Sequence, residues 1–79
     1  MKLEVITPKG VELQADALKL ILPTMMGEIT VLPHHVPLIS VLKAGIMTIA
    51  TKDQNIEREI EGGIVEIDQN EAVVLLKKF

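Results

Sequence analysis

Apolar and polar residues alternate with a period of two along much of this 79-residue chain. The alternation is clear at residues 2–5, 18–22 and 65–68. A period of two is typical of a β-strand, whose successive side chains point to opposite faces, whereas a helix has a period of about 3.6 residues. No long segment shows the helical period. The pattern therefore predicts half-buried strands and an all-β fold.

Clusters of Pro, Gly, Asp, Asn and Gln separate the strand-like segments, and such clusters mark turns. They lie at residues 8–10, 23–27, 53–55, 61–63 and 68–70. Their spacing predicts about eight to ten short strands. Because no linker, repeat or low-complexity segment interrupts the pattern, we expect residues 1–79 to form a single domain.

Composition limits both the core and the partners of the chain. Phe79 is the only aromatic residue, so the interior has to be built from Val, Ile, Leu and Met. A net charge of −3 and the lack of aromatic platforms argue against nucleic-acid binding. The absence of cysteine excludes a thiolate metal site and fits a reducing compartment. No apolar stretch approaches the roughly 20 residues needed to cross a bilayer, so we expect no direct membrane insertion.

Charge is distributed unevenly along the chain. Residues 46–71 contain seven acidic side chains against Lys52 and Arg58, whereas residues 20–42 contain Glu28 as their only formally charged residue. Glutamates 57, 59 and 61 share one strand face, which predicts a solvated sheet edge. The long uncharged, Pro-rich segment is either core or a docking surface.

The adjacent His34 and His35 are the first candidates for chemistry, because histidine is a common metal ligand. Adjacent strand residues point to opposite faces, but Pro33 and Pro37 predict a turn here. Glu28 could supply a third ligand, and no fourth ligand is evident. A metal-dependent enzyme is therefore one hypothesis, and structural or interface histidines are the other interpretation.

A second alternative comes from Met25 and Met26. This pair is similar to the hairpin of biotin- and lipoate-carrying domains, which are also small, acidic and all-β. Those domains need a modifiable lysine at the hairpin tip, where this chain has Thr24-Met25-Met26-Gly27. A carrier or small ligand-binding β module without this lysine is the alternative function.

Residues 22–38, with the sequence LPTMMGEITVLPHHVPL, resemble the central signature of the epsilon subunit of F-type ATP synthases. That signature is a Gly-Glu pair, an apolar strand, Leu-Pro and then His-x-Pro-Leu. The segments TPKG at residues 7–10, LKAG at 42–45 and EGGIVE at 61–66 are similar to further motifs of the family, in the same order. The resemblance covers residues 1–76 and implies a flattened β-sandwich of short, mostly antiparallel strands.

The resemblance also implies a function without catalysis or a cofactor. Members of this family are central-stalk rotor subunits that link the gamma subunit to the membrane c-ring and couple ion translocation to ATP synthesis. The chain would be monomeric within the complex, peripheral at the cytoplasmic face of the bacterial inner membrane, with an apolar face against gamma. The residues carried over as c-ring contacts are Gly27, Glu28, Thr30, His34 and His35. We expect Glu28 and His35 to lie together at one end of the sandwich.

The chain departs from the family pattern at three points. Thr30 and His34 stand where glycine is common in the family, and Ala44 stands where proline is usual. The family also continues into a C-terminal helical hairpin that can bind ATP, and residues 1–79 do not contain it. We therefore expect no nucleotide binding by these residues.

Overall fold

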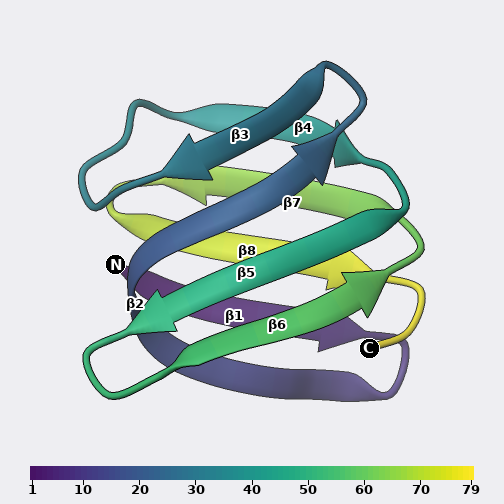
Figure 1. Cartoon of the computed structure of the whole chain (residues 1–79), viewed down its shortest axis with the longest axis horizontal. Helices are drawn as coiled ribbons and strands as arrows, with labels where there is room; N and C mark the ends of the chain where they lie inside the picture. The colour runs from purple at the N-terminus through teal and green to yellow at the C-terminus, as the bar shows by residue number, and fades with distance from the viewer.

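The computed structural model describes residues 1–79 as eight β-strands without a helix, which confirms the all-β prediction (Figure 1). Five connections coincide with the predicted turn clusters and the β3–β4 loop contains the turn expected from Pro33 and Pro37, whereas the β4–β5 turn at residues 43–44 is not among the predicted turns. None of the elements is a helix long and apolar enough to span a membrane. The strands are β1 (Lys2–Thr7), β2 (Gly10–Thr24), β3 (Gly27–Val31), β4 (Leu38–Leu42), β5 (Gly45–Thr51), β6 (Asn55–Ile60), β7 (Gly63–Asp68) and β8 (Glu71–Leu76).

Strand β2 belongs to both layers of the sandwich. Its first half pairs with β1, which continues through β8 and β7 to β4; this layer is called the β8 sheet. Its second half pairs with β3 on one side and β5 on the other, and β6 follows β5; this layer is called the β5 sheet. Only β1 and β8 pair in parallel. The arrangement confirms the predicted sandwich of mostly antiparallel strands.

The length of β2 differs from the short strands that the turn spacing predicts, because it spans 15 residues. Its register against β5 shifts between Ala17 and Lys19, which forms a bulge. As a result Ala17 is buried and Leu18 is exposed. The expected inward alternation of Leu18 with Leu20 and Leu22 is therefore wrong at Leu18. A bulge bends a strand and increases its twist, and this allows β2 to pass from one sheet to the other.

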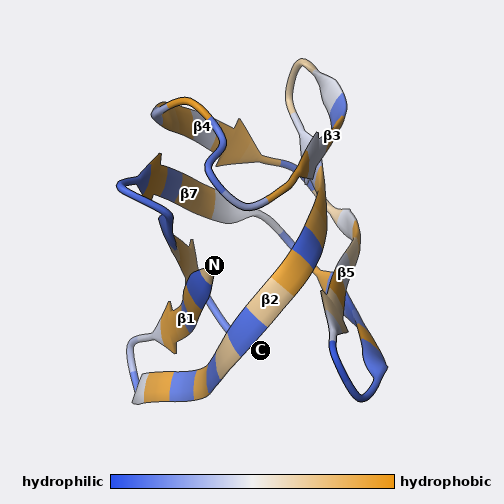
Figure 2. Cartoon of the chain, turned by 90° about the vertical axis from the view of Figure 1, so that its left-hand side faces the viewer, coloured by the Kyte–Doolittle hydropathy of each residue, from blue (hydrophilic) through white to orange (hydrophobic).

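The inward-facing side chains of both sheets form one core of Val, Ile, Leu, Met and Ala, as the composition predicts. Figure 2 shows alternating hydrophobic and hydrophilic bands along β2 and the neighbouring strands. This alternation turns one set of side chains toward the core. The largest fully buried hydrophobic side chains come from both layers. They are Leu3, Val5, Ile67, Val65 and Val74 of the β8 sheet, and Leu20, Leu22, Val31, Met47, Ile49 and Ile60 from β2, β3, β5 and β6.

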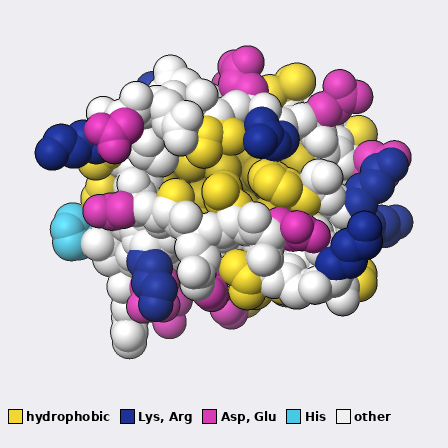
Figure 3. All heavy atoms as spheres, turned by 90° about the horizontal axis from the view of Figure 1, so that it is seen from below, with side chains coloured by type: hydrophobic (Ala, Val, Ile, Leu, Met, Phe, Trp, Pro, Cys, Tyr) yellow, Lys and Arg dark blue, Asp and Glu magenta, His cyan; other side chains and the backbone are white.

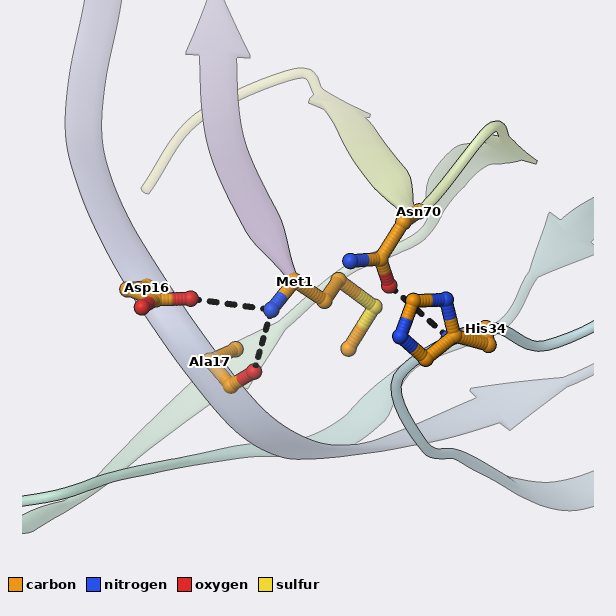
Figure 4. A network of polar contacts seen from close by, with 5 residues as sticks. All are labelled: Met1, Asp16, Ala17, His34 and Asn70. Carbon is orange, nitrogen blue, oxygen red and sulfur yellow. Dashed lines mark hydrogen bonds and ion pairs between the residues drawn. The ribbon is translucent and has the colours of Figure 1, made fainter.

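Polar contacts around Met1 connect three parts of the chain (Figure 4). The Met1 ammonium donates to Asp16 Oδ1 at 2.9 Å and to the Ala17 carbonyl oxygen at 3.0 Å. The Lys2 amide donates to the Asn70 carbonyl oxygen at 3.2 Å, and the His34 amide donates to Asn70 Oδ1 at 2.8 Å. These bonds hold the loop after β3 against the turn between β7 and β8, next to the start of β1.

Candidate interaction surfaces

The β2–β3 hairpin is held by the hydroxyl group of Thr24, whose side chain is fully buried. Thr24 Oγ1 accepts a hydrogen bond from the Met26 amide at 3.1 Å and donates one to the Gly27 carbonyl oxygen. Gly27 has a φ of 111°, a conformation that residues with a Cβ rarely adopt, so the turn depends on glycine here. The hairpin tip contains no lysine, and it presents Met25 and Met26 to solvent.

Glu28 and Thr30 project from β3 on the outer face of the β5 sheet. In the β2–β3 register Glu28 lies opposite Pro23 and Thr30 lies opposite Ile21. Leu20, Leu22 and Thr24 of β2 are fully buried, so the alternation places Ile21, Pro23 and their partners on the other face of the sheet, where Ile21 is half-buried and Pro23 is buried. Glu28 and Thr30 are exposed, and Glu28 takes part in no ion pair. Their side chains are therefore free to contact another protein.

His34 and His35 lie in the loop that connects β3 to β4. His34 has a φ of 65°, in the left-handed region that glycine adopts most easily. The His35 amide donates to the Leu32 carbonyl oxygen at 3.2 Å, and His35 Nδ1 lies 2.6 Å from the Val36 carbonyl oxygen, so Nδ1 is the donor. No three His, Asp or Glu side chains are grouped so as to hold a metal ion.

Glu28 and His35 are not neighbours, so the expectation that they lie together is wrong. Glu28 is near the start of β3, and the three further strand residues to Val31 add about 10 Å before the loop with His35 begins. The two turn signals at residues 23–27 and 33–37 mark opposite ends of an extended strand, not one loop. Strand β3, which carries Glu28, lies in the upper part of Figure 1, and the loop with His35 continues from its end.

The outer face of the β8 sheet carries a cross-strand row of aliphatic side chains, here called the apolar row. Each member lies opposite the next in the strand register. Four of its five members are exposed, and Ile6 is half-buried. The row consists of Val41 (β4), Ile64 (β7), Leu75 (β8), Ile6 (β1) and Val11 (β2).

The sequence contains a signal for this row that alternation alone does not reveal. Strands β4 and β8 read LISVL and EAVVLL, so each has apolar residues on both faces. A strand that is apolar on both faces, in a sandwich whose outer face is open, must expose part of its apolar surface. Such a surface marks a contact with another molecule more often than a scattered hydrophobic residue does.

A second apolar area lies on the opposite side of the molecule from β3. Figure 3 shows hydrophobic side chains gathered at the middle of this face, with Lys, Arg, Asp and Glu around them. The strands on this side include the edge strand β6, where Glu57 and Glu59 are exposed as predicted, whereas Glu61 follows the end of the strand and pairs with Lys78. Leu13 of β2 and Ile56 of β6 are only partly buried against the core.

The fold defines the chain as a small β-sandwich domain. It belongs to the family described as "ATP synthase, Delta/Epsilon chain, beta-sandwich domain", whose model matches residues 1–79. This confirms the family that the motifs at residues 7–10, 22–38, 42–45 and 61–66 predict.

Curated relatives agree with the family assignment. The ATP synthase epsilon chain of Sulfurimonas denitrificans is 40% identical over 78 residues, and that of Moorella thermoacetica is 40% identical over 76 residues. The alignments cover 98% and 95% of this chain, but only 60% and 57% of the two relatives. The chain thus spans about three fifths of their length.

Solved structures share the fold at low sequence identity. A chain in the central stalk and c-ring structure of the Tetrahymena thermophila mitochondrial ATP synthase matches 96% of this chain with a TM-score of 0.82 and 18% identity. A chain in the Euglena gracilis mitochondrial ATP synthase structure, containing OSCP, F1 and c-ring, matches 96% with a TM-score of 0.87 and 17% identity. The matches cover 62% and 49% of those chains.

Proposed function

We propose that this chain is the β-sandwich part of a non-catalytic epsilon-type subunit in the central stalk of a rotary F-type ATP synthase. It links the gamma subunit to the membrane c-ring and so couples ion translocation to ATP synthesis. It acts as one copy per complex, peripheral at the cytoplasmic face of a bacterial inner membrane. Family membership and the names of the relatives support this function. The observation that carries it is the presence of two chemically different surfaces on opposite sheets.

The apolar row is the surface that binds gamma in this proposal. Its aliphatic side chains are aligned across β4, β7, β8, β1 and β2, so one rigid partner can cover them together. Removing aliphatic surface from water contributes about 25 cal/mol per Å². The core of a protein interface is depleted in charged residues, and none interrupts this row. A rotor subunit needs such a contact because it must turn with its partner.

The β3 side of the molecule is the surface that contacts the c-ring. Gly27 shapes the hairpin, and Glu28 and Thr30 present oxygen atoms that can accept hydrogen bonds from amide or basic groups of the ring. His34 and His35 extend the contact at the far end of β3. Polar contacts of this kind fix the orientation of two partners more than they increase affinity.

Rebinding of the subunit to an epsilon-depleted ATP synthase tests the proposal. Val41 is 56% exposed in the apolar row, and Ile46 is 51% exposed on β5 outside it, so they form a matched pair. Val41→Asp should weaken binding to the gamma-containing catalytic complex by at least tenfold, on the order of 1.4 kcal/mol, because an unpaired carboxylate becomes buried. Ile46→Asp should change affinity by less than about threefold.

Circular dichroism of both variants separates lost binding from lost folding. Equal effects of the two substitutions on affinity, with both proteins folded, would contradict the assignment of the row to gamma. Normal binding of the Val41→Asp variant would also contradict the assignment of the apolar row to gamma.

A further inference from the structure

We propose that Met25, at the tip of the β2–β3 hairpin, extends the apolar row and contacts the same partner, whereas its neighbour Met26 does not. This inference rests on the proposed function, because it takes the gamma subunit as that partner. It assigns the two sides of one hairpin to different roles. Nothing in the sequence distinguishes the two methionines, so the distinction comes from the strand register.

The register places Met25 at the end of the row. Thr24 of β2 lies opposite Leu42 of β4, and both side chains face the core. Two backbone hydrogen bonds flank this pair: the Met25 amide donates to the Val41 carbonyl oxygen, and the Lys43 amide donates to the Pro23 carbonyl oxygen, each at 2.9 Å. The antiparallel pairing therefore continues by one residue and sets Met25 opposite Val41. Opposite residues share a face, so Met25 points outward with Val41.

The hairpin is ordered before any partner arrives. Thr24 Oγ1 bonds both the Met26 amide and the Gly27 carbonyl group, and the bond from Met25 to Val41 ties the tip to β4. A loop that is already fixed loses less conformational entropy on binding than a flexible one. The side chain of methionine remains adaptable, with a polarisable sulfur atom that packs against irregular apolar surfaces.

Solvent exposure alone would favour Met26, not Met25, as the contact with the partner. Met26 is 93% exposed and Met25 is 65% exposed, yet Met26 occupies the turn beyond the paired residues. The chain then returns through Glu28, which lies opposite Pro23 on the outer face of the β5 sheet. The hairpin thus has an apolar side that continues the row and a polar side that belongs to β3.

Affinity measurements with single substitutions test the two assignments. The subunit is titrated into the gamma-containing catalytic complex, depleted of epsilon and without the c-ring. Met25→Ser should weaken binding by about tenfold, because the methionine side chain that the partner would cover is lost from the interface. Met25→Leu keeps the apolar volume and should stay within about threefold of the unmodified subunit. Met26→Ser should also stay within about threefold.

Each contrary outcome has a separate meaning. If Met26→Ser weakens binding as much as Met25→Ser, the register argument is overturned. If the Met25→Ser variant binds the gamma-containing complex normally while the Val41→Asp variant does not, the inference fails and the proposed function stands. If the Val41→Asp variant also binds this complex normally, the proposed function fails as well. Loss of attachment to the isolated c-ring, with normal affinity for gamma, would place Met25 on the ring and overturn the inference. The free subunit could also sediment as a dimer that the Met25→Ser substitution dissociates. That outcome would place a second copy of the chain, and not gamma, against Met25, and would overturn the inference.

Discussion

A Cβ atom on Gly63 of β7 would collide with the carbonyl oxygen of Leu75 on the paired strand β8. The obstacle is backbone, which cannot move aside as a flexible side chain can. Gly63→Ala should therefore lower the free energy of unfolding by more than about 3 kcal/mol, at the severe end of the range for single substitutions. Urea unfolding followed by circular dichroism measures this change.

Gly27→Ala is the matched control, since a Cβ atom there meets nothing within 4 Å although φ is 111°. Its cost should be limited to backbone strain, about 1–3 kcal/mol. A Gly63→Ala variant that is as stable as Gly27→Ala would show that β7 and β8 can separate easily.

The hydroxyl group of Thr24 should contribute to stability through its two hydrogen bonds in the hairpin. Thr24→Val keeps the shape of the side chain but leaves the Gly27 carbonyl group and the Met26 amide without this partner, so we expect a loss of about 1–3 kcal/mol. Amide exchange at Met26 should become faster. Thr48→Val, at a half-buried threonine of β5, should change stability by less than about 0.5 kcal/mol. Equal stability of the two variants would rule out this role for the hydroxyl group.

Asn70 combines a left-handed backbone, with φ of 59°, and a side-chain bond to the His34 amide. Asn70→Gly removes only the bond, whereas Asn70→Ala also strains the backbone, so the alanine variant should be less stable than the glycine variant by about 1 kcal/mol. This order is the reverse of the usual one in strands and helices. Faster exchange of the His34 amide in both variants would show that the bond holds the loop. If exchange there is unchanged, the loop is held by other contacts.

Local sequence signals were sufficient to predict most of the fold. Period-two alternation and turn residues predict the strands and their ends, because both depend only on neighbouring residues. The bulge at Ala17 and Leu18 could not be predicted, since it arises from the passage of β2 between two sheets. That passage depends on pairing with β1 and β5, which lie far apart in the sequence.

The interaction surfaces were less predictable for the same physical reason. The motif at residues 22–38 indicates Glu28 and His35, but it does not show that an extended strand separates them. The apolar row joins residues from β4, β7, β8, β1 and β2 that only the strand register brings into line. Residues such as Leu75 and Ile6 resemble core residues in the sequence, and the alternation of each strand has to be combined with its neighbours to show that they face outward.

The separation of Glu28 from His35 leads to a prediction about coupling to the c-ring. Both side chains are accessible, so Glu28→Ala and His35→Ala should each change stability by less than about 0.5 kcal/mol. In membranes with the reconstituted enzyme, each substitution should reduce ATP-driven ion uptake relative to ATP hydrolysis, because a rotor contact is loosened while the catalytic head is unchanged. Glu59→Ala, at the exposed edge strand β6, is the control and should leave this ratio unaltered.

The double variant distinguishes two independent contacts from one shared contact. Sites more than about 7–10 Å apart with no common partner usually have additive effects, within about 0.3–0.5 kcal/mol. Because β3 keeps Glu28 and His35 apart, the logarithms of the two single-variant losses in the uptake-to-hydrolysis ratio should add in the double variant. A double variant no worse than the stronger single variant would indicate one shared contact on the ring. Equal losses of hydrolysis and ion uptake would instead show that these residues do not act at the ring at all.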